Sequence, residues 1–327
     1  MAADDDDWDV PLEAQPKPSD YGFDLDHALR AVVTLTARIP PEAYTAETLG
    51  TERAGSAVVI GRDNLVLTIG YLVVEANEIW LTTGMGRVVA AHLIGYDFVT
   101  GFGLLQAQGP LDCPFLPLGD SRIARPGDRV VLAGPGGRGG SIAAHIIARQ
   151  QFAGYWEYLL DDAIFTAPAH PHWAGTALIG PAGELWAIGS LQVPHQIHGE
   201  QVVPLNMLVP IEAFLPIFKD LTSRGRANRP PRPWLGLFSA ETSSNDIVIA
   251  GLAGEGPAQR AGLREGDIVL AVDDREVKTL SDFYKAIWAL GEAGVEVPLR
   301  LDREGDVFDV RIASADRELF LIKSRLH

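Results

Sequence analysis

The histidines of this 327-residue chain are the first residues whose type and spacing could carry chemistry. His170 and His172 lie two residues apart, and His195 and His198 form a second pair. Four imidazoles on two loops could bind Zn²⁺ or Cu²⁺ if the fold brought the loops together. Histidines exposed on polar loops have the same spacing without a metal, and we favour that interpretation. The sequence therefore predicts no metal and no cofactor.

A second candidate for chemistry is Gly236, within the run WLGL at 234–237. Glycine allows successive backbone N–H groups to converge into a concave site for an anion, and a strand with a free edge follows it. A peptide C-terminus could bind there as an added strand, with its last side chain in an apolar pocket. The predicted peptide-binding residues are Trp234, Leu235, Gly236, Leu237, Phe283 and Ile287.

Phe283 and Ile287 have two interpretations. Their spacing of i, i+4 places both on one face of a predicted helix, where they could line the pocket. Leu280, Tyr284 and Trp288 compete for the same core-facing side, so Phe283 and Ile287 could instead be ordinary core residues.

The elements that must position these residues are short strands. Between 55 and 105, runs such as SAVVI, LVLTIG and EIWLTT alternate with turn residues, and a second set of β-rich runs lies between 129 and 193. Runs of this length and spacing are typical of antiparallel sheets rather than parallel α/β folds. The sequence predicts a mainly β protein with two six-stranded antiparallel barrels, followed by a C-terminal α+β domain.

The composition predicts four regions. Residues 1–26 contain nine acids against Lys17, which is typical of a disordered tail, although Trp8 could instead anchor a docking peptide. The paired barrels follow over 27–221. The Pro-rich run TSRGRANRPPRP forms a stiff linker at 222–233, and the α+β domain fills 234–327.

The charge and the cysteine count limit the class of function. A formal charge of −16 argues against nucleic-acid binding, which needs basic patches. No apolar run reaches the roughly 18 residues that span a bilayer, and the first ten residues do not resemble a signal peptide. Cys113 is the single cysteine, so no intrachain disulfide can form. Together these features predict a cytoplasmic protein without a membrane span.

The C-terminal domain resembles a PDZ domain of the HtrA family. The residues that carry this resemblance are GPA at 256–258 and AGLREGDIV at 261–269, and WLGL at 234–237 resembles the carboxylate-binding loop of that family. The resemblance implies that the partner is a peptide or protein with a free apolar C-terminus.

The barrel region resembles the trypsin-like protease domain of the same family. Four motifs occur in the family's order: GSAVVI at 55–60, LT followed by VV at 67–74, GDS with RPGD and VVLAG at 119–134, and VPLN at 203–206. Four motifs in order make chance an improbable explanation, and the resemblance implies a Ser-His-Asp protease site.

The catalytic positions of that site depart from the family pattern. A serine protease needs a nucleophilic hydroxyl, an imidazole base and an orienting carboxylate. The matching positions hold Tyr71, Gly101 and Ala174 instead, and His172 and Trp173 occupy the oxyanion turn. Thr176 lies two residues from Ala174, but it has no histidine at a family position to pair with.

These departures lead to one main prediction and two alternatives. The main one is an HtrA-like pseudoprotease, lacking catalysis, that binds C-termini through its PDZ domain as a scaffold, adaptor or chaperone-like protein. The first alternative is a serine-type endopeptidase with an unconventional site. The second is an assembly role, because HtrA relatives often form trimers through the N-terminal part of the protease domain, where Tyr21 and Phe23 lie in this chain.

Overall fold

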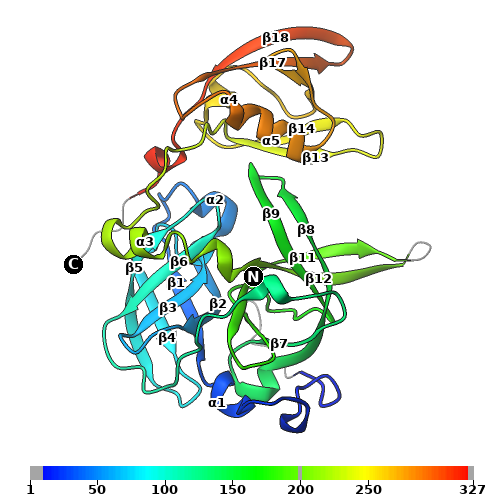
Figure 1. Cartoon of the computed structure of the whole chain (residues 1–327). Coiled ribbons are helices and arrows are strands. Elements are labelled where there is room, and N and C mark those ends of the chain that lie inside the picture. Colours follow the sequence, from blue (N-terminus) through cyan, green and yellow to red (C-terminus); the bar gives the residue numbers. More distant parts are fainter. Residues whose placement is uncertain (1–9, 198–200, 323–327) are drawn as a thin grey trace. The chain divides into compact units, whose positions relative to one another are not determined.

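The computed structural model of the chain describes residues 10–197 and 201–322 (Figure 1). The chain divides into two compact units. The first unit comprises Met1–Gln150, Asp162–Ala227 and Ile322–His327, and the second comprises Gln151–Asp161 and Asn228–Leu321. The second unit thus includes a short segment from the middle of the chain in addition to its C-terminal part.

The first barrel closes in the strand order β1-β2-β3-β6-β5-β4. In β1, alternation of apolar and more polar residues buries Val33, Leu35 and Ala37, because successive side chains of a strand point to opposite faces. The strands are β1 (Val32–Arg38), β2 (Glu52–Val59), β3 (Leu65–Ile69), β4 (Glu78–Thr82), β5 (Val88–Tyr96) and β6 (Phe102–Ala107).

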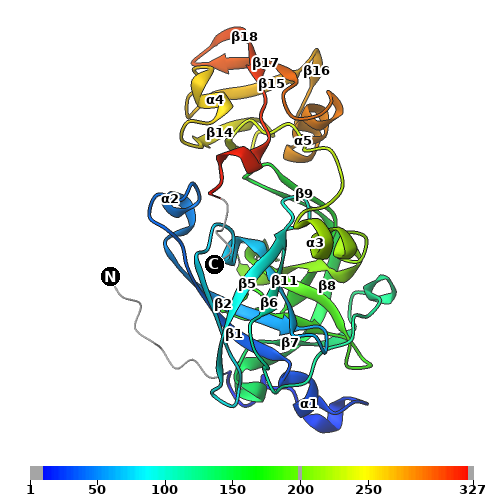
Figure 2. The ribbon, with the colours of Figure 1, turned by 90° about the vertical axis from the view of Figure 1, so that its left-hand side faces the viewer.

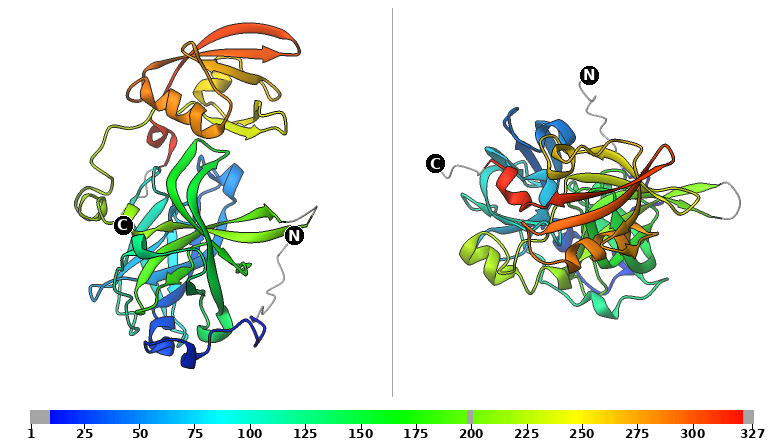
Figure 3. Two further views of the ribbon diagram at one scale, coloured as in Figure 1. Left: turned by 45° about the vertical axis from the view of Figure 1, so that its right-hand side comes forward. Right: turned by 90° about the horizontal axis from the view of Figure 1, so that it is seen from above.

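The second barrel closes in the order β10-β11-β12-β9-β8-β7, and Trp186 is among its buried residues. Its strands are β7 (Arg129–Ala133), β8 (Ser141–Gly154), β9 (Tyr158–Ala167), β10 (Ala177–Ile179), β11 (Leu185–Gln196) and β12 (Val202–Pro210). The outer part of the β11–β12 hairpin extends beyond the barrel (Figure 3). The prediction of two six-stranded antiparallel barrels is confirmed.

Helices are short in the first unit. They are α1 (Leu25–Leu29), α2 (Ala46–Leu49) and α3 (Phe218–Arg224), with 3-10 turns at Pro18–Asp20, Gly70–Leu72, Ser121–Ile123, Gly137–Gly140 and Ile211–Ala213. Over residues 10–197 and 201–322, the chain has no helix with the length and apolar character needed to span a bilayer.

The second unit has one sheet in the order β13-β14-β15-β17-β18, with β16 paired to β15 (Figure 2). Helix α5 begins after Thr279, whose hydroxyl accepts a hydrogen bond from the Asp282 N–H, the usual N-cap contact. The predicted α+β domain is confirmed. Its elements are β13 (Leu237–Glu241), β14 (Ile247–Leu252), α4 (Pro257–Arg260), β15 (Ile268–Val272), β16 (Arg275–Glu276), α5 (Leu280–Ala289), β17 (Glu296–Arg303), β18 (Asp306–Ala313) and a 3-10 turn at Arg317–Phe320.

The N-terminal segment is ordered from residue 10. Val10 is buried in the core of the second barrel, and its N–H donates to Gly139 O over 2.8 Å. Asp20 and Asp26 form ion pairs with arginines of the same unit. The prediction of a disordered tail is therefore wrong for residues 10–26, because buried apolar surface and ion pairs offset the acidic self-repulsion. Residues 1–9, with Trp8, lie outside the described residues.

Candidate functional site

Tyr71 stands at the position where the resemblance expects the catalytic histidine. It lies in the 3-10 turn that follows β3, and Arg53 holds this turn by donating to Tyr71 O over 2.7 Å and to Val74 O over 3.2 Å. The Tyr71 hydroxyl donates to Ser190 O over 2.7 Å. Burial raises the pKa of the phenol, and a hydrogen bond with the Trp173 side chain opposes that shift. A phenol in this environment stays protonated and cannot act as a base at neutral pH.

Gly101 occupies the position of the expected aspartate, in a turn that has its own polar contacts. Asp97 accepts hydrogen bonds from the N–H of Thr100 over 2.9 Å and from its hydroxyl over 2.6 Å, and Gly101 N–H donates to Asp97 O. Gly101 has a φ of +84°, a backbone conformation that side chains disfavour. The backbone conformation of the turn therefore favours glycine at position 101.

A tyrosine ring fills the space beside the turn that carries Tyr71. A Cβ atom placed on Gly70 would lie 2.0 Å from Cε2 of Tyr96, and Gly70 N–H donates to Gly101 O over 2.6 Å. The structure therefore brings positions 71 and 101 close together. The Tyr96 ring packs against Gly70, the residue that precedes Tyr71.

The turn at Ala174 is also closely packed. Ser56 N–H donates to Ala174 O over 2.8 Å, and a Cβ atom on Gly175 would lie 1.8 Å from Ser56 O. The Thr176 hydroxyl is fully buried and donates to Trp173 O over 2.9 Å. The Thr176 hydroxyl is thus engaged with the backbone of its own turn.

His170 uses both of its ring nitrogens within the protein. Nδ1 accepts a hydrogen bond from His172 N–H over 3.1 Å, and Nε2 lies 3.0 Å from Gly140 O, to which it must donate. This pattern assigns the neutral Nε2–H tautomer. Burial lowers the pKa of the ring, the bond to Gly140 opposes this, and His172 adds to the lowering. Asn206 further fixes the His170 backbone through its side-chain amide.

The other predicted histidines do not complete a metal site. His195 is exposed on β11, and His198 lies outside the described residues. Within the described ranges, no group of three or more His, Cys, Asp or Glu side chains is arranged to hold a metal ion.

The predicted carboxylate loop holds a carboxylate. The N–H groups of Leu235, Gly236 and Leu237 all donate to the Glu157 side chain, at 3.1, 2.7 and 2.8 Å to the nearer oxygen. Gly236 has a φ of +79°, which lets the three donors converge. Burial raises the pKa of Glu157 to about 7, while the hydrogen bonds from Leu237, Leu235 and Gly236 and the charge of Arg317 lower it.

The predicted pocket residues lie in one apolar cluster. Leu235, Leu237, Phe283 and Ile287 are fully buried or nearly so and share this cluster with Leu159. Trp234 is also buried, and its backbone pairs with Ala315. Phe283 and Ile287 are thus core residues of the second unit, and they also contact a cluster that Leu159 joins from a distant part of the chain. The core interpretation and the pocket interpretation are therefore compatible.

Glu157 and Leu159 are the site residues that sequence analysis missed. Both lie in or beside the turn of the β8–β9 hairpin, in the segment Gln151–Asp161 that belongs to the second unit. The only local signal is an acid among aromatic residues, in the run YWEY at 155–158. That signal does not predict a contact with a loop nearly 80 residues away.

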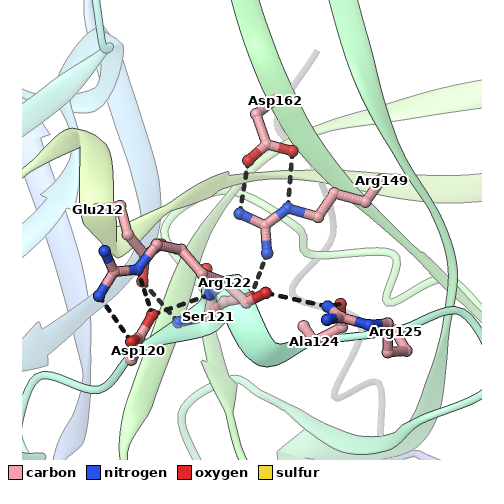
Figure 4. Close-up of polar contacts among 8 residues, drawn as sticks. All are labelled: Asp120, Ser121, Arg122, Ala124, Arg125, Arg149, Asp162 and Glu212. Carbon is pink, nitrogen blue, oxygen red and sulfur yellow. Dashed lines mark hydrogen bonds and ion pairs between the residues drawn. The ribbon is translucent and has the colours of Figure 1, made fainter.

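The base of the same hairpin is held within the first unit (Figure 4). Arg149 of β8 donates to both carboxylate oxygens of Asp162 on β9 and also to Ser121 O. Ser121 in turn donates its N–H and its hydroxyl to the two oxygens of Glu212. These charge-assisted bonds hold the bases of β8 and β9 together within the first unit.

Comparisons with known proteins define the class. Residues 55–188 match the trypsin-like peptidase domain, and residues 233–313 match the PDZ domain. The fold is similar to that of the solved HtrA-type protease AlgW with tripeptide, with a TM-score of 0.53 and 24% identity over 92% of this chain and 97% of that one. The chain is thus a trypsin-like peptidase domain followed by a PDZ domain.

Curated relatives carry the assignment further. The chain is 27% identical over 274 residues to the probable periplasmic serine endoprotease DegP-like of Halomonas elongata, covering 80% of this chain and 56% of the relative. It is 25% identical over 275 residues to the serine endoprotease DegS of Escherichia coli K12, covering 79% of this chain and 75% of that relative. Over most of its length the chain is similar to serine endoproteases of the DegP and DegS kind. It spans little more than half the length of the DegP-like relatives.

The prediction of a cytoplasmic location is wrong. The DegP-like relatives are described as periplasmic endoproteases, which points to the cell envelope. The error has a physical reason: a single cysteine cannot form an intrachain disulfide in any compartment, so the cysteine count does not discriminate between them.

Proposed function

We propose that this HtrA-family protein is a pseudoprotease that binds peptide or protein C-termini through its PDZ domain. The partner is a chain with a free carboxylate and an apolar last side chain. In this proposal the former catalytic region has a structural role, and the protein acts as a scaffold, adaptor or chaperone-like factor.

The observation that carries this proposal is the ring of three N–H donors at Leu235, Gly236 and Leu237. Their convergence on the Glu157 carboxylate supports a carboxylate as the group that this loop accepts. A C-terminal carboxylate presents the same two oxygens, and charge-assisted hydrogen bonds of this kind are among the stronger ones in proteins. The β13 edge beside the loop supports strand addition by a peptide.

The absence of catalysis in this proposal rests on positions 71, 101 and 174. A protonated phenol, a glycine and an alanine supply neither base, nor orienting carboxylate, nor nucleophile. The polar groups near them bond to backbone: the Tyr71 hydroxyl to Ser190 O, and the Thr176 hydroxyl to Trp173 O.

The binding function is tested by titrating the full chain with a peptide library whose members have free apolar C-termini. Matched peptides with amidated C-termini are the control. Binding of the free acids that amidation weakens is the expected result. Equal binding of both forms would reject carboxylate capture.

The alternative function is a serine-type endopeptidase with an unconventional site, which the names of the relatives favour. An active-site-directed fluorophosphonate distinguishes the two functions, because it labels an activated hydroxyl. We expect no labelling of this chain, and labelling at any Ser or Thr would establish the alternative.

We also infer a homotrimer that forms through the segment containing Tyr21 and Phe23. The Tyr21 hydroxyl is buried and has no hydrogen-bond partner among the described residues. The rest of the residue is only partly buried and its ring packs beside the Phe23 ring, so the two rings offer an aromatic contact for a neighbouring chain.

A further inference from the structure

The tip of the β8–β9 hairpin lies in the groove where a peptide ligand would bind. Besides the Glu157 contacts with the carboxylate loop, Ser239 N–H of β13 donates to Tyr155 O over 2.7 Å. On the helical side, the Tyr284 hydroxyl of α5 donates to Gly154 O over 2.8 Å. The tip therefore bonds to both the strand and the helix that would border a bound peptide.

The tip also supplies apolar contacts. Leu159 is buried in the cluster that contains Leu237, Phe283 and Ile287, and Ala153 packs against the same cluster. The Tyr155 ring lies 5.9 Å from the Phe238 ring of β13, measured between centroids. The hairpin thus buries a leucine at the site that the sequence predicts for a ligand's last side chain, and its Tyr155 ring covers Phe238 from the solvent side.

Three recognition elements of a C-terminal peptide are therefore already provided by one chain segment. A carboxylate lies in the N–H loop, a backbone carbonyl bonds to the β13 edge, and a leucine joins the apolar cluster. These are the contacts that strand addition of a peptide would need. The same N–H groups cannot bond fully to two carboxylates, so occupation by the tip and occupation by a ligand exclude each other.

We propose that the segment Gln151–Asp161 is an internal ligand of the PDZ domain, with the Glu157 carboxylate in the place of a ligand's C-terminus. This inference rests on the proposed function in one respect: the competitor is a peptide or protein C-terminus. Only molecules in which the tip has left the groove can bind such a partner. The apparent affinity is therefore the intrinsic affinity multiplied by the fraction of these molecules. Because the hairpin competes with the ligand, only C-termini with a high affinity or at a high concentration bind to a large fraction of the molecules.

The first test measures the internal contact without any added ligand. Amide hydrogen exchange by NMR is compared for the wild type, Glu157→Gln and Glu157→Ala in the full chain. We expect the amides of residues 235–237 to exchange faster in Glu157→Ala, with Glu157→Gln intermediate because its amide oxygen still accepts. Unchanged exchange in both variants would overturn the proposal.

The matched control is Glu304→Gln. Glu304 lies in the β17–β18 turn of the same unit, is exposed, and has a φ of +56° close to the +58° of Glu157. The Glu304→Gln substitution replaces a carboxylate by an amide in a turn residue with a similar backbone conformation. We expect its exchange rates at residues 235–237 to equal those of the wild type, and a matching increase in this control would assign the effect to charge alone.

The second test titrates the same proteins with the free-acid and amidated peptides. We expect the free acids to bind Glu157→Ala about tenfold or more tightly than the wild type, since the competing state is lost. Measurable binding that is equal in the two proteins would overturn the competition. Faster exchange with no binding by any variant would sustain the internal ligand and reject the proposed function.

Discussion

The Tyr71 phenol donates a hydrogen bond to Ser190 O, and the residues around it pack closely against each other. The neighbouring glycines have the same character. Gly70 leaves room for the Tyr96 ring, and Gly101 adopts a positive φ. Replacing one side chain in such a set affects the packing of the others.

The first prediction concerns restoration of the triad. The triple variant Tyr71→His, Gly101→Asp, Ala174→Ser is expected to show no proteolysis, although its three side chains are those of the family. An aspartate at φ +84° is strained by about 1–3 kcal/mol, so its carboxylate is not held for the histidine. His172 also remains in the oxyanion turn.

The measurements for this variant are cleavage of a fluorogenic casein and labelling by a fluorophosphonate. The wild type is the control, and a thermal unfolding curve establishes that the variant is folded. Turnover of casein, or labelling of the variant at position 174, would contradict the prediction.

The second prediction concerns pH and His170. Because burial lowers the pKa of this histidine, the folded chain binds a proton there less readily than the unfolded chain, which protonates it near pH 6.5. The unfolded state then binds more protons, so stability falls as pH falls below about 6.5. The loss can reach about 1.4 kcal/mol per pH unit for one proton.

The check compares the free energy of unfolding of the wild type and His170→Gln between pH 8 and pH 5. The wild type should lose stability more steeply than the variant below pH 6.5. Parallel profiles would show that His170 titrates alike in both states.

At the scale of elements, the β8–β9 hairpin has two differently held parts. Its base is fixed by Arg149, Asp162 and Ser121 within the first unit, and its tip belongs to the second. A hairpin defined at its base presents the residues of its tip in a fixed register, because strand pairing sets which side chains share a face.

The third prediction removes the base contact. Arg149→Met should lower the free energy of unfolding by about 1–2 kcal/mol, because it leaves the carbonyl of the buried Ser121 without its donor, whereas water can replace the bond to the half-exposed Asp162. The control is Arg122→Met, whose arginine is exposed and pairs with its near neighbour Asp120. Surface pairs of that kind contribute little. Urea titration measures both, and equal losses in the two variants would contradict the prediction.

At the scale of the whole molecule, the negative charge and the buried Tyr21 hydroxyl bear on partners. A charge of −16 disfavours nucleic acid and leaves protein partners as the expected class. The Tyr21 side chain packs near Phe23, with ring centroids 5.6 Å apart, and the Phe23 ring lies against Gly183. This small aromatic group is the surface proposed for assembly.

The fourth prediction is that the wild type sediments as a trimer and that Tyr21→Ala shifts the equilibrium towards the monomer, because the neighbouring chain loses an aromatic contact. Sedimentation equilibrium over a range of concentrations measures this. A wild type that is monomeric throughout would contradict the trimer, and an unchanged equilibrium in Tyr21→Ala would show that its ring is not used.

The sequence by itself determined the strand-rich architecture and the residue types at the positions where the resemblance expects catalytic groups. The period of two in runs such as Val32–Arg38 follows from the geometry of a strand, so it can be recognised locally. The side chains at positions 71, 101 and 174 are likewise a matter of residue identity. The glycine of the carboxylate loop was also predictable, because converging N–H groups need a positive φ.

Only the tertiary structure decided what lies in that loop. Glu157 is 78 to 80 residues away from its three donors, and no local pattern links segments at such a distance. The order of residues 10–26 was missed for the same reason, since Val10 is buried by a barrel formed from much later residues. Local periodicity reports on one element at a time, whereas burial and hydrogen-bond partners depend on which elements meet.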